Sequence, residues 1–255
     1  MNHPPDCRPP SRLRRIRHAL SSTGLRRTLG DLARLLRLRG GPDLGADRSF
    51  DLRFGTHTSG SVEIENLGFA DAEAGQNAIR YLPSPDYVSR WMIAAVGIDH
   101  VAFAFVDLGC GKGRVALVAS EFPFRRVIGI DLSAELVAIA AKNARVIAQR
   151  HPARTPIETE VADAARFAFP ELPLLVHLYH PFQSNILARV LDHLHASVQA
   201  QPRRVVVTYL LYTSAIDEVL ATFAPHTWLP LVRREGSLLG QHDWLIFDSA
   251  AGQGA

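Results

Sequence analysis

The chain has 255 residues, of which 47% are hydrophobic, and this predicts one ordinary domain with appendages and ample residues for a large core. Its apolar runs all fall short of the roughly 20 residues that a membrane span needs, and its two cysteines, Cys7 and Cys110, offer no disulfide framework. We therefore expect a reducing, cytoplasmic compartment. The formal net charge of +3 hides an asymmetry, because residues 1–40 carry ten Arg and two Asp whereas the rest carries 18 basic and 23 acidic side chains.

The basic segment at the N-terminus is predicted to be an appendage. Residues 11–39 have helical character, and an apolar stripe runs among their arginines at Leu25, Leu29, Leu32 and Leu36. Three interpretations remain open: a helix that docks on the main domain or on a second subunit, a basic amphipathic segment that contacts anionic lipid or nucleic acid, and an organellar targeting peptide. We assign residues 1–49 to this tail and its linker, 50–97 to a lead-in region and 98–250 to the main domain.

The lead-in region combines loop signals with short regular elements. Residues 55–60, Gly-Thr-His-Thr-Ser-Gly, are predicted to form a loop, and the alternation over residues 62–64 predicts a short strand. Residues 81–85, Tyr-Leu-Pro-Ser-Pro, predict a rigid turn before a first long helix over 86–96. Taken alone, this region indicates an N-terminal cap over the sheet.

The stretch from Val101 to Asp131 organises the main domain. An apolar run over 101–108 predicts a buried strand, a glycine-rich turn follows, residues 114–121 are helix-like, and a second apolar run over 127–130 closes at Asp131. Strand, turn, helix and strand make a βαβ unit, which belongs in a parallel sheet because its crossover is right-handed. The glycines allow a sharp bend and bring backbone N–H groups close to a ligand at the helix N-terminus.

The remaining chain continues this alternation. Ser133 is predicted to cap a helix that ends at Arg150. The predicted fold class is α/β: a seven-stranded, mostly parallel, doubly wound sheet with an N-terminal helical extension. The last two strands are expected to form an antiparallel pair at the sheet edge. Further strands are predicted at 157–161, 174–178, 204–210, 228–233 and 243–248, and further helices at 185–198 and 214–223.

The sequence Asp-Leu-Gly-Cys-Gly-Lys-Gly at residues 107–113 resembles motif I of the class I (Rossmann-like) S-adenosylmethionine (SAM) methyltransferases. A dinucleotide-binding site typically has the glycine spacing G-x-G-x-x-G, which differs from the spacing here. A nicotinamide or flavin site, and a glycine turn without a ligand, remain as alternatives. In the family the loop binds the methionine end of SAM, and acidic residues after the second and third strands bind the ribose and the adenine. The resemblance implies SAM as the cofactor, S-adenosylhomocysteine as the product, and these cofactor-binding residues: Asp107, Gly109, Cys110, Gly111, Gly113, Asp131, Leu132, Asp163 and Ala164.

The turn at residues 81–85 carries a second resemblance. A Tyr-x-Pro-Ser/Thr segment precedes motif I in uncharacterised bacterial members of the family and in mitochondrial lysine methyltransferases, and Tyr81 and Ser84 match it. In those proteins the segment lines the cofactor and acceptor pocket. The resemblance therefore implies that Tyr81 contacts the cofactor and Ser84 the acceptor, whereas the alternative is a Tyr and a Pro packed at a helix start.

Residues 179–182, Tyr-His-Pro-Phe, stand at motif IV of the family, where amino-methylating members carry Asn-Pro-Pro-Tyr/Phe or Asn-Pro-Phe. Pro181 and Phe182 match, which implies contacts to the acceptor, but His180 replaces the expected Asn. An unperturbed imidazole titrates near about 6.5 and suits a general base, and Tyr179 and Phe182 can form an aromatic wall. We expect His180 and Tyr179 to be the catalytic residues; alternatively, His180 caps the strand end.

The predicted reaction is methyl transfer to a nitrogen of a protein side chain or of a small amine. One alternative is an RNA methyltransferase that uses the Arg-rich tail, and another is a non-catalytic SAM-binding interaction protein. His177 lies in an apolar run and is expected to be a core histidine. No metal is expected, because no His pairs with Cys or carboxylates at ligand spacing.

Overall fold

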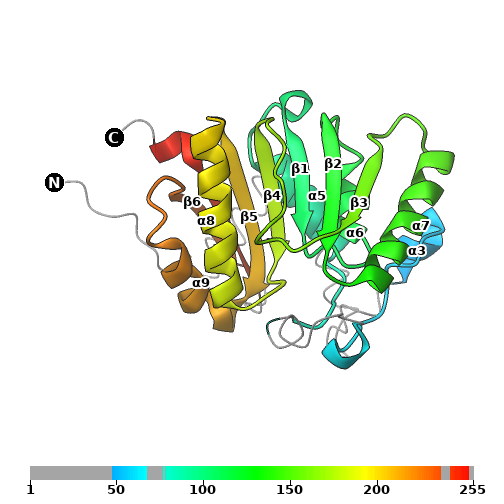
Figure 1. Cartoon of the computed structure of the whole chain (residues 1–255). Helices are drawn as coiled ribbons and strands as arrows, with labels where there is room; N and C mark the ends of the chain where they lie inside the picture. The colour runs from blue at the N-terminus through cyan, green and yellow to red at the C-terminus, as the bar shows by residue number, and fades with distance from the viewer. Residues whose placement is uncertain (1–47, 68–76, 78, 237–241, 253–255) are drawn as a thin grey trace.

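The computed structural model describes residues 48–67, 77, 79–236 and 242–252. The predicted tail helix and the linker up to residue 47 lie outside the described residues. Seven strands form one sheet in the order β3-β2-β1-β4-β5-β7-β6 (Figure 1). Strands β1 to β5 are parallel, β7 is antiparallel to β5, and β6 is antiparallel to β7. The predicted mostly parallel sheet with an antiparallel pair at its edge is therefore confirmed.

Strands and helices alternate along the main domain, as its periodicity predicted. The strands are β1 (Ala104–Leu108), β2 (Arg126–Asp131), β3 (Ile157–Val161), β4 (Leu174–Tyr179), β5 (Val205–Tyr212), β6 (Leu231–Gly236) and β7 (His242–Asp248). The α-helices are α3 (Ser49–Phe54), α5 (Asp86–Ala95), α6 (Arg114–Ala119), α7 (Ala134–Arg150), α8 (Ser184–Ala200) and α9 (Ile216–Phe223). Within the described residues, no helix combines the length and the apolar character that crossing a membrane requires.

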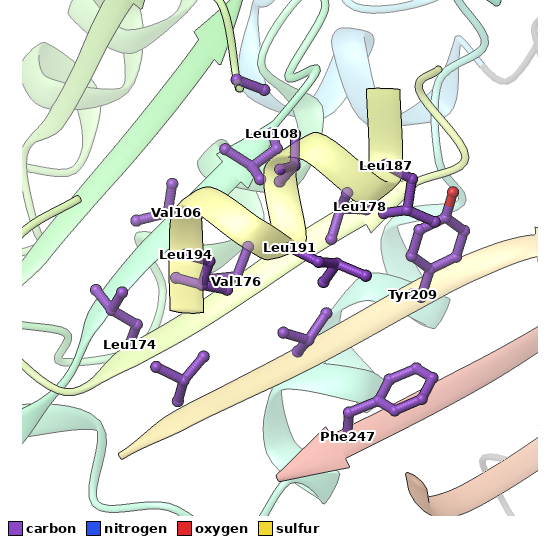
Figure 2. Packing of buried hydrophobic residues seen from close by; sticks show 14 of the residues in the cluster. Val106, Leu108, Leu174, Val176, Leu178, Leu187, Leu191, Leu194, Tyr209 and Phe247 are labelled. Carbon is purple, nitrogen blue, oxygen red and sulfur yellow. The ribbon is translucent and has the colours of Figure 1, made fainter. Parts of the chain in front are cut away.

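Helices cover both faces of the sheet, and this is why the central strands are continuous apolar runs. On one face, Val106 of β1 and Leu178 of β4 pack with Leu191 of α8 (Figure 2). On the other face, Phe105 of β1 packs in a cluster with side chains of α3, α5, α6 and α7. Ile147 is the member from α7. The carboxyl ends of the five parallel strands are thereby held at one edge of a rigid sheet.

The start of the first strand differs from the prediction. Val101 is 57% exposed and belongs to a 3-10 turn at His100–Ala102, so β1 begins only at Ala104. The Asp99 carboxylate accepts a hydrogen bond of 3.3 Å from the Val101 N–H and thereby stabilises this turn. An apolar run alone does not separate a buried strand from an exposed turn that precedes it.

The lead-in region also differs from its prediction. Residues 62–64 are not a strand, because Val62 forms an isolated bridge with Tyr81 and Ile64–Asn66 is a 3-10 turn. Helix α3 was not predicted, and β6 begins at Leu231 rather than at residue 228. The predicted cap of α7 is confirmed, since the Ser133 hydroxyl accepts a hydrogen bond of 3.2 Å from the Leu136 N–H.

Candidate functional site

A cavity of about 460 Å³ opens at the carboxyl ends of the parallel strands. It lies where the strand order reverses between β1 and β4, the usual position of a ligand in an open α/β sheet. All the predicted site residues except Gly111 and Gly113 line it. Those that do are Tyr81, Ser84, Asp107, Gly109, Cys110, Asp131, Leu132, Asp163, Ala164, Tyr179, His180, Pro181 and Phe182.

The glycine loop between β1 and α6 needs its glycines. Gly109, Gly111 and Gly113 have φ angles of 75°, 54° and 84°, in the left-handed region that other residues rarely adopt. A Cβ atom on Gly109 would collide with Pro181, and one on Gly111 would collide with the ring of Tyr81. The loop is therefore packed between the end of β4 and the lead-in region, and of its three glycines only Gly109 also lines the cavity.

Asp131 at the end of β2 holds the glycine loop by a hydrogen bond from a backbone N–H group. Its Oδ2 accepts a hydrogen bond of 2.9 Å from the Gly111 N–H, and its Oδ1 accepts one of 2.9 Å from the Ser133 N–H. Burial raises the pKa of Asp131, and these backbone hydrogen bonds oppose the rise. Each carboxylate oxygen has further lone pairs, and the residue lines the cavity.

Asp107 is a buried carboxyl group at the end of β1. It is 2% exposed, and its Oδ2 has no hydrogen-bond partner among the described residues. Burial and the nearby Asp131 raise the pKa of Asp107 to about 8. A buried acceptor without a partner that also lines a cavity is suited to a cationic or hydrogen-bond-donating ligand group.

Asp163 follows β3 and lies in the same cavity wall as Asp131. The Ala162 N–H donates to the Asp131 carbonyl oxygen at 3.0 Å, which ties the two strand ends together. Asp163 Oδ1 accepts a hydrogen bond of 2.9 Å from the Ala165 N–H, so the carboxylate closes the turn in which it sits. The three carboxyl groups among the described lining residues thus all come from the β1–β3 half of the cavity.

A strap formed by residues 55–60 covers the glycine loop, and the sequence predicted it only as a loop. Asp51 organises the strap: its carboxylate accepts hydrogen bonds from the backbone N–H groups and the hydroxyls of Thr58 and Ser59. Burial alone would raise the pKa of Asp51, but these hydrogen bonds outweigh it and lower the pKa to about 2.

Two side chains bind the strap to the main domain. Arg114 at the start of α6 is 1% exposed and donates to the Thr58 hydroxyl at 2.8 Å. Asn143 of α7 accepts from the His57 N–H at 2.8 Å and donates to the Lys112 carbonyl oxygen at 2.9 Å. These residues were missed, because nothing local in the sequence pairs positions that lie 56 and 86 residues apart.

Tyr81 joins the strap to the cavity. Its hydroxyl donates to the Thr58 carbonyl oxygen at 2.7 Å, and its ring lies against Gly111. The Lys112 ammonium donates to the Ser59 carbonyl oxygen at 2.8 Å and lies 5.1 Å from the centre of the Tyr81 ring. Tyr81 therefore lies between the glycine loop and the cavity, and Ser84 is buried in the same cavity wall.

His180 adopts an unusual backbone conformation at the end of β4. Its φ is 37°, the single positive value for a non-glycine residue in the described parts of the chain. Such strain is typical of functional positions. Its Nδ1 lies 3.2 Å from the hydroxyl of the buried Tyr209, and burial lowers the pKa of His180. The carbonyl oxygen of the following Pro181 accepts a hydrogen bond of 3.3 Å from the Ile79 N–H.

Tyr179 directs its side chain to the opposite face from its neighbour. Its hydroxyl lies 3.3 Å from Nε2 of His242, and it also shares a hydrogen bond with Tyr212. Burial raises the pKa of the Tyr179 phenol. Tyr179 and Tyr212 line the cavity, whereas His242 lies behind them. Neither Tyr212 nor His242 was singled out from the sequence, because both depend on pairing between β5 and β7.

Two further predicted residues are buried. His177 packs against Phe105, its Nδ1 lies 3.1 Å from the Thr208 hydroxyl, and burial lowers the pKa of His177 to about 3. Its Nε2 has no hydrogen-bond partner among the described residues, so only one of the two ring nitrogens of this core histidine is satisfied.

Burial raises the pKa of the Cys110 thiol well above its usual range, which makes this cysteine a poor nucleophile. The described residues contain no group of three or more potential metal ligands.

Comparison with known proteins gives a match to one domain model and a match to one fold. Residues 105–200 match the family model of a methyltransferase domain. A solved structure of a SAM-dependent methyltransferase from Aquifex aeolicus superposes with a TM-score of 0.52 at 12% identity, over 65% of this chain and 93% of that one. At that identity the match shows a shared fold.

Two curated relatives match parts of the chain. The ribosomal protein L11 methyltransferase of Cupriavidus necator is 33% identical over 129 residues, which cover 49% of this chain and 37% of the relative. The 23S rRNA (uracil(747)-C(5))-methyltransferase of Serratia proteamaculans is 31% identical over 135 residues, which cover 52% of this chain and 31% of the relative. The chain thus spans less than half the length of each of these relatives.

Proposed function

We propose that this chain, whose residues 105–200 form a class I SAM-dependent methyltransferase domain, transfers a methyl group from SAM to a nitrogen of a protein side chain or of a small amine. The observation that carries the proposal is the arrangement of Asp107, the glycine loop and Asp131 around one cavity at adjacent strand ends. The Asp131 carboxylate suits the ribose of SAM, and the unpartnered buried carboxyl oxygen of Asp107 suits the ammonium of its methionine end.

Each part of the cofactor has a proposed partner. Gly109 and Cys110 line the cavity beside the methionine end, Asp107 accepts from its ammonium directly or through water, Asp131 and Leu132 hold the ribose, and Asp163 and Ala164 hold the adenine. Tyr81 covers the loop from the strap. A cavity of about 460 Å³ lies within the range of roughly 300–1,000 Å³ that is usual for ligand sites.

When bound, the cofactor supplies a methyl carbon that its sulfonium charge has already activated. The residues of this chain then have three tasks: to hold the acceptor nitrogen in line, to exclude water, and to accept the proton that the nitrogen must lose. The side chains of Tyr179, His180 and Phe182 line the half of the cavity next to β4 and β5, and we assign the acceptor to this half.

The nitrogen acceptor rests on two features of the sequence. Pro181 and Phe182 keep the end of the motif found in amino-methylating enzymes, and the Tyr-x-Pro-Ser segment with Tyr81 and Ser84 favours a lysine side chain. The two curated relatives described above are named for a ribosomal protein and for 23S rRNA, so RNA is the alternative acceptor. The cytoplasmic location, and the role of the Arg-rich tail in docking, lipid or RNA contact, or targeting, stay predictions.

Calorimetric titration with SAM and with S-adenosylhomocysteine tests the cofactor assignment. A hydrogen bond to a charged group contributes about 1.5–3 kcal/mol, so Asp131→Ala is expected to weaken binding by about 10- to 100-fold. Glu135→Ala is the matched control, because this exposed carboxylate in the first turn of α7 does not line the cavity. If neither compound binds the wild-type chain, the proposal fails.

Methyl transfer itself is tested with tritium-labelled SAM and a cell extract. Label that survives ribonuclease but not protease supports a protein acceptor, and label that survives both and passes a small-pore filter supports a small amine. Label that ribonuclease releases indicates the RNA alternative. SAM binding without a labelled product in any fraction indicates a non-catalytic SAM-binding protein.

A further inference from the structure

We propose that Tyr179 is the group that removes the proton from the acceptor nitrogen, and that it does so by passing its own hydroxyl proton to His242. This inference rests on the proposed function and adds a proton path to it. As the acceptor N–H bond breaks, its proton binds the Tyr179 oxygen, the Tyr179 O–H bond breaks, and that proton binds Nε2 of His242. The products are a neutral amine with a free lone pair, a neutral phenol and an imidazolium.

Three neighbouring strands bring the participants together on one face of the sheet. Tyr179 is the last residue of β4, Tyr212 is the last of β5, and His242 is the first of β7. Tyr212 pairs directly with His242 in the antiparallel register, with ring centres 4.5 Å apart. The Tyr179 hydroxyl lies 3.3 Å from Nε2 of His242. Because Tyr179 lines the cavity and His242 does not, the path leads from the acceptor into a second layer.

His180, the residue expected to be the base, is poorly placed for that task. Tyr209 is fully buried, and its hydroxyl lies 3.2 Å from Nδ1 of His180. A phenol is a much stronger acid than a neutral imidazole N–H, so Tyr209 donates and Nδ1 of His180 is the acceptor. The neutral ring then carries its proton on Nε2. His180 therefore offers the acceptor an N–H donor and no lone pair.

The charged and titratable groups around His242 favour this path. They include Tyr179 of β4, Tyr212 of β5 and Asp243 of β7. Arg234 of β6 joins this group through an ion pair of 3.5 Å with Asp243. Burial lowers the pKa of His242, and Asp243 opposes this change. The ring is thus neutral near pH 7 and can take up a proton, while the Asp243 carboxylate stabilises the resulting charge.

Two variants separate proton uptake from mere support of Tyr179. Tyr179→Phe removes the phenol, and His242→Gln keeps an amide oxygen that accepts the Tyr179 O–H but does not take up a proton at neutral pH. General base catalysis contributes about 10²- to 10⁴-fold, and we expect both variants to lose turnover by a factor in this range. Their affinity for SAM stays that of the wild type. His195→Gln is the matched control, since His195 stacks on Trp228 outside the cavity.

Two measurements distinguish proton transfer from a merely structural role of His242: the pH dependence of the rate and the protonation of the histidine ring nitrogens. Initial rates of label transfer from tritiated SAM to the cell extract should fall on the acid side in the wild type and in His195→Gln. In His242→Gln this acid limb should move to higher pH, because the rate then follows the fraction of acceptor amine that is already neutral. An acid limb that keeps its wild-type position in His242→Gln overturns the proposal. A limb that moves only in a His180→Asn variant also overturns it.

The second readout needs no activity, so it stands even if the proposed function fails. In ¹⁵N-histidine spectra of the ligand-free chain at pH 7.5, assigned by the signals lost in each variant, we expect a bare Nε2 on His242 and a protonated Nε2 on His180. Tyr179→Phe should shift the Nε2 signal of His242 and leave that of His180 in place. A protonated Nε2 on His242, or a bare Nε2 on His180, contradicts the proposed path.

Discussion

Replacement of Gly111 by alanine probes the contact between the glycine loop and the lead-in region. The residue has a φ of 54°, and its new Cβ would collide with the ring of Tyr81. The left-handed conformation costs a residue with a Cβ about 1–2 kcal/mol. A displaced Tyr81 also loses the hydrogen bond of 2.7 Å to the Thr58 carbonyl oxygen, which contributes about 1 kcal/mol. We therefore expect Gly111→Ala to lower the free energy of unfolding by about 2–3 kcal/mol.

Gly97→Ala is the matched control for the free-energy cost of placing a residue with a Cβ at a positive φ. Its φ is 65°, and a Cβ at this position meets no atom within 4 Å. It should cost only the conformational term of about 1–2 kcal/mol and leave the affinity for SAM unchanged. Gly111→Ala should in addition weaken SAM binding by at least about 10-fold, because it moves the loop whose amide donates to Asp131.

Urea unfolding, analysed with the same dependence of unfolding free energy on urea concentration for all variants, measures the loss of stability. Calorimetric titration measures the loss of SAM affinity. The decisive comparison repeats Gly111→Ala in a Tyr81→Ala background, where the colliding ring is gone. There the glycine substitution should cost no more than Gly97→Ala does. Equal losses for Gly111→Ala and Gly97→Ala in the wild-type background, or an undiminished loss in the Tyr81→Ala background, would refute the packing argument.

Two further predictions concern pH and buried carboxyl groups. Because the folded-state pKa of Asp51 is depressed to about 2, its contribution to stability is present above the unfolded pKa of 3.8 and is lost as pH falls toward 2. Asp51→Asn should therefore be less stable than the wild type by about 1–2 kcal/mol at pH 7, allowing for partial exposure, and the two stabilities should converge as pH falls to about 2. The pKa of Asp107 is raised to about 8, so its stability contribution is present below pH 3.8 and is lost progressively as pH rises to 8. Asp107→Asn should gain stability relative to the ligand-free wild type between pH 5 and pH 8, and a constant difference in denaturant midpoints across that range would contradict the assignment.

The β1–loop–β2 part of the site was predictable because its chemistry is local. Left-handed turns at Gly109, Gly111 and Gly113 follow from the spacing of the glycines, and the carboxylates of Asp107 and Asp131 follow from the strand ends on either side. Hydrophobic periodicity predicted the order and type of the main-domain elements for the same reason. Errors appeared where an apolar run met a turn, as at Val101.

The strap over the loop was not predictable, because its stability comes from contacts between distant segments. Asp51 looks like any acidic residue of a short helix until residues 58 and 59 fold back onto it. Arg114 looks like a surface residue of a helix start, yet it is buried by its hydrogen bond to Thr58. Charge and hydropathy predict exposure for both side chains, but their tertiary partners leave Asp51 half-buried and Arg114 fully buried.

The two halves of the cavity differ in how their polar groups are oriented, and this difference bears on the choice of general base. In the cofactor half, carboxylates end parallel strands and bond to the backbone next to them, as Asp131 does. In the acceptor half, the positive φ of His180 turns its ring toward Tyr209, on the face opposite Tyr179. A motif read along the chain treats neighbouring side chains as equivalent candidates. The backbone instead separates them: Tyr179 lies beside His242, whereas His180 lies beside Tyr209. The proposed proton path follows from this separation, because it assigns the acceptor to the side on which Tyr179 has a second titratable group next to it.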